Sequence, residues 1–87
     1  MAVYLVERDV PGMRIEQLIA AQLAAIRTSQ QFSQTGIPVR YIRSTFVPAD
    51  GRCACLFEAP DPVTVREVND AAGLPYSRVV EALDLTP

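Results

Sequence analysis

The chain has 87 residues, enough for one small domain and too few for two, so we expect a single domain over residues 1–87. Hydrophobic residues make up 49% of the chain, which favours a folded domain over a disordered one. The net charge is −2, which argues against nucleic-acid binding, because that function normally needs a basic excess. Histidine is absent, which removes the commonest metal ligand and general base.

Membrane insertion and secretion are also not expected. No run approaches the roughly 18 apolar residues of a membrane span. The first residues carry acid where a signal peptide has basic side chains, so we expect a cytoplasmic protein. Cys53 and Cys55 lie two positions apart on a predicted strand, at or beyond the limit for a disulfide. Without further Cys or His they supply half of a tetrahedral metal site, so we interpret them as small core side chains.

The first elements along the chain are a strand and a helix. Residues 2–8 contain strand-forming Val, Tyr and Leu, and both faces of that strand are apolar. From Met13 the period of apolar residues changes to 3.6, which predicts a helix to about Ser29. Residues 30–35 could extend the helix or form a loop before Gly36 and Pro38. The helix has one apolar stripe, made of Ile15, Leu18, Ile19, Leu23 and Ile26.

A hairpin and a second helix follow. Two apolar-rich runs, residues 39–47 and 52–58, flank a turn at residues 48–51 in which Gly51 accepts a positive φ. Asp61 and Pro62 start a helix as cap and first residue. That helix should stop at Gly73, and residues 77–85 form the last strand.

The element order βαββαβ predicts an α+β, ferredoxin-like fold. Right-handed crossovers place the strands in the order 4-1-3-2, with both helices on one face of a four-stranded antiparallel sheet. The other face has no helix over it. Because the chain is more apolar than one small core can hide, we expect this open face to form a homodimer.

Side-chain alternation sorts the hairpin between the two faces. With an even-length turn, one face under the helices takes Ile42, Ser44, Phe46, Cys53, Cys55 and Phe57. The open face takes Val39, Tyr41, Arg43, Thr45, Val47, Arg52, Ala54, Leu56 and Glu58. For the first and last strands both parities are acceptable. If Glu7 and Glu81 also point to the open face, a ligand-binding cluster of Glu7, Glu58 and Glu81 forms around Arg43 and Tyr41. The alternative is that these are ordinary solvated charges or cross-strand pairs.

Four segments together resemble a small bacterial, ferredoxin-like family known as a domain of unknown function, which includes an actinobacterial nickel-binding protein. They are residues 4–8, 41–44, 55–61 and 73–75. The resemblance implies a ferredoxin-like fold, a dimer packed through open sheet faces, and nickel as a cofactor. Arg43 stands where many members carry histidine, and a fixed cation in place of a ligand argues against nickel here.

Three functional hypotheses remain open. The first is a small dimeric binding protein without catalytic activity that takes a small molecule or a divalent metal. The second is a cofactor-independent enzyme of the monooxygenase or isomerase type, whose base would be Glu7, Glu58 or Glu81 with a pKa raised by burial. The third is an interaction module whose sheet face serves only assembly.

Overall fold

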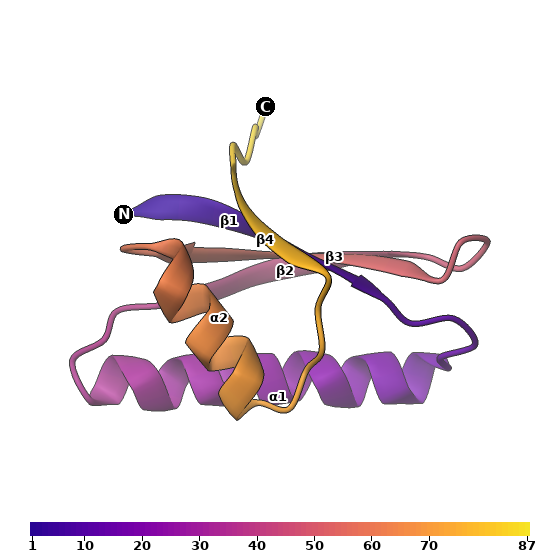
Figure 1. The fold of residues 1–87 in the computed structure, drawn as a ribbon, viewed down its shortest axis with the longest axis horizontal. Coiled ribbons are helices and arrows are strands. Elements are labelled where there is room, and N and C mark those ends of the chain that lie inside the picture. The colour runs from indigo at the N-terminus through magenta and orange to yellow at the C-terminus, as the bar shows by residue number, and fades with distance from the viewer.

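The computed structural model describes all residues from 1 to 87 and has the predicted βαββαβ order. Its elements are β1 (Ala2–Asp9), α1 (Ile15–Gln34), β2 (Arg40–Val47), β3 (Arg52–Ala59), α2 (Pro62–Ala71) and β4 (Arg78–Ala82). The strands pair antiparallel in the order β2-β3-β1-β4, which is the predicted order read from the other edge. Both helices lie on the same face of the sheet (Figure 1).

The second helix begins and ends where its sequence predicts. The Asp61 carboxylate accepts a hydrogen bond of 2.8 Å from the Thr64 amide, which satisfies one of the N–H groups without a partner in the first turn. Pro62 is the first helical residue. Gly73, at φ +71°, ends the helix in a conformation that other residues rarely adopt.

Of the two alternatives left open for residues 30–35, the structure has the helical one up to Gln34, and the chain leaves α1 before Gly36, which takes φ +90°. The last strand is shorter than predicted. Residues 83–87 leave the sheet after β4 and project on the side opposite the helices (Figure 1). Neither helix combines the length and the apolar content needed to cross a membrane.

The core lies between the sheet, α2 and the second half of α1. Val6, Phe57, Val65 and Val68 are fully buried there. The buried residues of α1 are Ala25, Thr28 and Ser29, all in its second half. The apolar stripe predicted for α1 is therefore only partly covered, since Ile15 is 63%, Ile19 49% and Leu23 43% exposed.

A β-bulge changes the predicted alternation of β2. Phe46 and Ser44 pair with Cys53 and Cys55 on the helix side, as expected. The register then shifts between Tyr41 and Arg43, so that Tyr41, and not Ile42, pairs with Phe57. The prediction that Ile42 lies under the helices beside Phe57 is wrong, because the extra residue in one strand reverses the alternation beyond it.

Candidate functional site

The open face of the sheet has an apolar centre. One row of paired residues crosses all four strands and consists of Arg43, Leu56, Leu5 and Val80. Leu5, Leu56 and Val80 are only half-buried, and no helix covers them. Val3 and Ala82 extend this apolar area into the next row.

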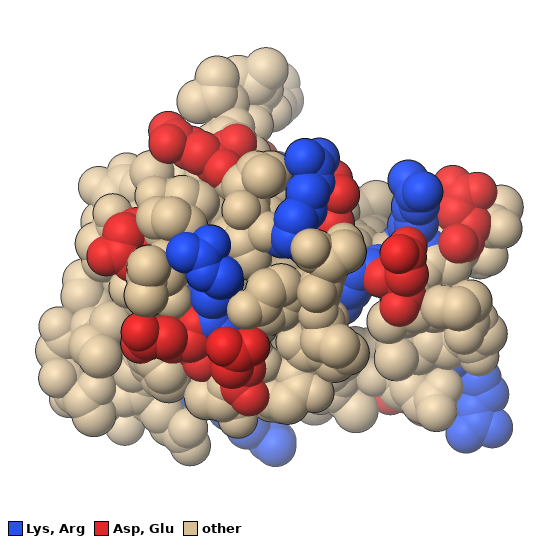
Figure 2. All heavy atoms as spheres, viewed as in Figure 1, with Lys and Arg blue, Asp and Glu red and all other residues tan.

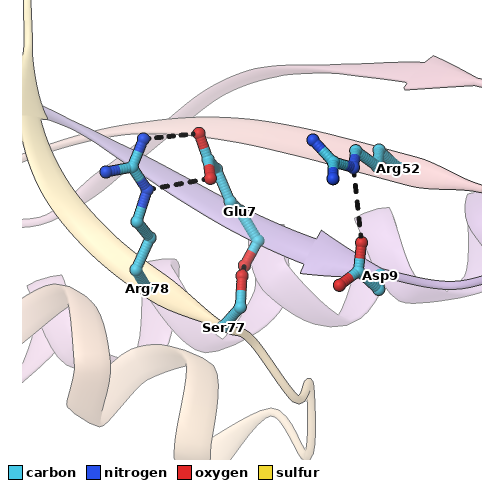
Figure 3. Close-up of polar contacts among 5 residues, drawn as sticks. All are labelled: Glu7, Asp9, Arg52, Ser77 and Arg78. Carbon is cyan, nitrogen blue, oxygen red and sulfur yellow. Dashed lines mark hydrogen bonds and ion pairs between the residues drawn. The ribbon is translucent and has the colours of Figure 1, made fainter. Parts of the chain in front are cut away.

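Glu7 is held in a two-point ion pair at the edge of this apolar centre. Arg78 Nε donates to Glu7 Oε2 at 2.8 Å, and a terminal nitrogen of Arg78 donates to Glu7 Oε1 at 3.0 Å (Figure 3). The hydroxyl of Ser77 donates to the backbone carbonyl of Glu7 at 3.0 Å. The hydrogen bonds and charge of Arg78 keep the pKa of Glu7 below its ordinary value of 4.5, so this carboxylate is ionised near neutral pH.

The other carboxylates of the open face also have arginine partners. Asp9 lies 3.8 Å from Arg52 (Figure 3), and Glu58 lies 3.4 Å from Arg40. Arg43 pairs with Asp84 in the segment after β4. A hollow of about 250 Å³ has Glu7, Asp9 and Arg52 among its lining residues. The open face is thus an apolar centre ringed by ion pairs.

The five residues predicted to bind a ligand do not form one cluster. Glu7, Arg43 and Glu58 lie on the open face, but Glu58 pairs with Val3, which is four residues from Glu7 along β1. That separation is about 13 Å. Glu81 pairs with Tyr4, so it shares the helix side of the sheet and not the open face. Tyr41 lies on the helix side because of the bulge.

Tyr41 instead belongs to a polar chain on the helix side. Its hydroxyl accepts from Gln22 Nε2 of α1 at 2.9 Å and lies 2.6 Å from the Ser44 hydroxyl. Ser44 in turn donates to Cys55 Sγ at 2.9 Å. The ring of Tyr41 meets Phe57 edge to face, with ring centroids 5.5 Å apart. These contacts use the polar groups of Tyr41 and Ser44 within the chain itself.

The two cysteines are buried, free thiols. Their sulfurs lie 3.9 Å apart on the helix side of β3. Burial, followed by the neighbouring Cys55, raises the pKa of Cys53 to about 11, so its thiol stays protonated near neutral pH. The interpretation of Cys53 and Cys55 as core side chains is confirmed by their burial.

A cavity that the sequence reasoning missed lies between the first half of α1 and the helix side of the sheet. Its volume is about 210 Å³, and its lining is mainly apolar. Arg8 also lines it, although this arginine is only 7% exposed. The alternation of β1 contains the signal: Tyr4, Val6 and Arg8 are successive residues of one face, and the last is a cation where a core side chain is expected.

No metal site is formed by the chain. No group of three or more His, Cys, Asp or Glu side chains lies close enough together to hold a metal ion. Of the carboxylates predicted for the site, Glu7 and Glu58 each face an arginine, and the Cys53 thiol is protonated. The donor set of one chain therefore does not fit nickel, which needs deprotonated ligands free to coordinate.

Comparison with known proteins agrees with this fold. The family described as nickel responsive protein SCO4226-like matches residues 4–82. The crystal structure of SCO4226 from Streptomyces coelicolor A3(2) superposes with a TM-score of 0.83 at 22% identity, covering 98% of this chain and all of the other. Among curated proteins, none matches the chain.

Proposed function

Because the chain belongs to the SCO4226-like family of nickel responsive proteins, we propose that it is a small binding protein without catalytic activity that forms a homodimer through its open sheet face. The observation that carries the proposal is the uncovered apolar row of Leu5, Leu56 and Val80. In a chain with 16 buried residues, this row is apolar surface that the core leaves exposed to water.

A second copy of the chain would remove the apolar centre of this face from contact with water. Three strands of eight residues and one of five, about 4.8 Å apart, present roughly 470 Å² in projection, against about 800 Å² per partner in a stable interface. Leu83 and Leu85, which are 82% and 86% exposed, belong to the segment after β4, and this segment projects on the same side of the sheet (Figure 1). The ring of ion pairs leaves few unpaired charges to bury. Glu7, Arg43 and Glu58 stay predicted contacts for a ligand or a partner at this interface.

The oligomeric state tests the dimer directly. Light scattering after size exclusion should give twice the 9.5 kDa mass of one chain. Leu56→Glu places a charge in the centre of the open face and should give a monomer. Val63→Glu is the matched control, since Val63 is 50% exposed on α2, and this variant should remain dimeric. A wild-type monomer at 100 µM (about 1 mg/ml), or a dimeric Leu56→Glu variant, would contradict the proposal.

Nickel is not part of the proposed function of this chain. The family description connects its members with a response to nickel, whereas the residues present here do not form a fitting donor set. We expect titration with Ni²⁺ to leave the melting temperature unchanged and to give no saturable heat in calorimetry. Stoichiometric, saturable Ni²⁺ binding by the dimer would show that residues of two copies complete a site.

The charges argue against the enzymatic alternative. A carboxylate that acts as general base near neutral pH needs a pKa raised by burial, and that of Glu7 is lowered by Arg78. The cavity on the helix side has no Asp or Glu in its lining. The mixed surface in Figure 2, where acidic and basic side chains are interspersed, also suits a binding protein that does not take nucleic acid. We propose a cytoplasmic location, which keeps the two free thiols reduced.

A further inference from the structure

We propose that the cavity beneath the first half of α1 binds a small apolar carboxylic acid, whose carboxylate pairs with Arg8. The cavity lies on the helix side of the sheet, so this site is separate from the open face and independent of the proposed homodimer. Its walls come from α1, the strands β1 to β3 and the loop before β4. Val10, Met13, Leu18 and Phe46 make it apolar, and Arg8 is the one charged residue that lines it.

The unpaired charge of Arg8 is the first reason for an anionic ligand. Arg8 donates to Asn69 Oδ1 at 2.8 Å and to the Pro75 carbonyl at 3.1 Å, and both acceptors are neutral. No carboxylate of the chain lies within ion-pair distance of it. A guanidinium keeps its charge in proteins and has five N–H donors. Because buried charges are normally paired, a ligand carboxylate would supply the missing anion and take the remaining donors.

The rest of the ligand should be apolar. The hydroxyls of Tyr41 and Ser44, which also line the cavity, are already bonded to each other, to Gln22 and to Cys55. These groups therefore do not call for a second polar group on the ligand. Apart from Arg8, the lining is mainly made of hydrophobic side chains, which gain contacts from carbon atoms of a ligand. The chemistry of the cavity thus has one cationic position and an apolar remainder.

The volume sets the size of the ligand. A cavity of roughly 150 Å³ in another protein holds benzene, whereas drug-sized ligands occupy roughly 300–1,000 Å³. The cavity of about 210 Å³ lies between these values, which suits one ring with a carboxylate or a short branched acid. Benzoate is the simplest probe of this class.

The loose packing of α1 gives the ligand a way in. Ile15 and Ile19 line the cavity and yet remain 63% and 49% exposed. No residue in the first half of α1 is buried. A bound ring would give these side chains an apolar neighbour. The ligand should therefore reduce the exposure of Ile15 and Ile19 to water when it binds.

The experiment compares benzoate with benzamide, which has nearly the same shape and no charge, by calorimetry and by amide NMR shifts of the full chain. We expect benzoate to bind saturably and at least tenfold more tightly than benzamide, with the largest shifts in residues 8–25. Equal affinity for the two compounds would overturn the role of Arg8. The absence of saturable binding at 10 mM benzoate (about 1.2 mg/ml) would overturn the site.

Two pairs of variants locate the binding. Ala21→Leu fills the cavity and should weaken benzoate binding at least tenfold, whereas Ala20→Leu, at the exposed neighbouring position of α1, should leave it unchanged. Arg8→Gln should remove the preference for benzoate, whereas Arg27→Gln, at an exposed position of α1, should keep it. Unchanged affinity in Ala21→Leu would overturn the proposal even if Arg8→Gln fails to fold.

Discussion

Arg78 donates hydrogen bonds to both carboxylate oxygens of Glu7 across the β1–β4 pair, at 2.8 and 3.0 Å. The two residues are direct partners in the sheet register, so the pair holds the start of β4 against the end of β1. The Ser77 side chain and its backbone amide bond the same residue from the adjoining position (Figure 3). A five-residue edge strand is thus fixed at the end where the chain enters it.

Replacing Glu7 should change how stability depends on acid. Since the pKa of Glu7 is lowered in the folded chain, its ionised form stabilises the fold above the ordinary value of 4.5, and this contribution is lost as the pH falls through the lower folded value. The melting temperature of Glu7→Gln should therefore fall less between pH 6 and pH 3 than that of the wild type. Thermal scans across that range measure it, with Glu67→Gln on the exposed side of α2 as control. Equal slopes in Glu7→Gln and wild type would refute the prediction.

The cap of α2 makes a second acid-sensitive contribution. Hydrogen bonds from Thr64 keep the pKa of Asp61 below its ordinary value of 3.8, so the carboxylate caps best when ionised and weakens as it is protonated. Asp61→Ala should lower the melting temperature at pH 7 by several degrees. Asp61→Asn should stay close to wild type at pH 7, because Asn caps about as well. If Asp61→Asn lost as much as Asp61→Ala at pH 7, the capping account would be wrong.

The thiol of Cys53 should resist alkylation in the folded protein. At pH 8 a thiol of ordinary pKa is roughly one-quarter thiolate, whereas a pKa of about 11 leaves about 0.1%. We therefore expect labelling by iodoacetamide to be at least about 100-fold slower than for an unfolded chain. Mass spectrometry of samples with and without denaturant measures the rates for Cys53 and Cys55 separately. Rapid labelling of Cys53 without denaturant would show that it is accessible and ionised.

Gly51 should tolerate substitution less well than Gly12. Both have a positive φ, +68° and +73°, so alanine at either position carries strain of roughly 1–2 kcal/mol. A Cβ on Gly51 would also lie 2.7 Å from the backbone Cα of Pro11, whereas one on Gly12 meets nothing within 4 Å. Gly51→Ala should therefore destabilise by about 1–3 kcal/mol more than Gly12→Ala in urea unfolding. Equal losses would mean that Pro11 moves without resistance.

The fold could be predicted well because the residues that start and end its helices and turns act locally. Asp61 with Pro62, Gly51 in the hairpin turn and Gly73 after α2 each act through neighbours within a few residues, and all three have the predicted conformation. The element order then leaves few topologies for a chain of this length. The family resemblance was confirmed by the match over residues 4–82.

The site was harder to predict because it depends on register between distant strands. One extra residue at Ile42 moved Tyr41 to the helix side, and no local signal marks such a bulge. Which residues of β4 face the helices, and therefore where Glu81 lies, is decided by the pairing of β4 with β1. The sequence pattern of β4 does not decide it, because both of its faces are acceptable. The partners of Arg43 and Arg8 lie 41 and 61 residues away along the chain, beyond any spacing rule.

The bulge in β2 also protects an edge of the sheet. β2 is an outermost strand, so one row of its backbone donors and acceptors has no strand beside it. The irregular backbone around Ile42 and the arginines at positions 40 and 43 make this edge a poor template for another chain. At the opposite edge β4 is only five residues long. Fibre-like growth by addition of strands at either edge of the sheet is thereby discouraged.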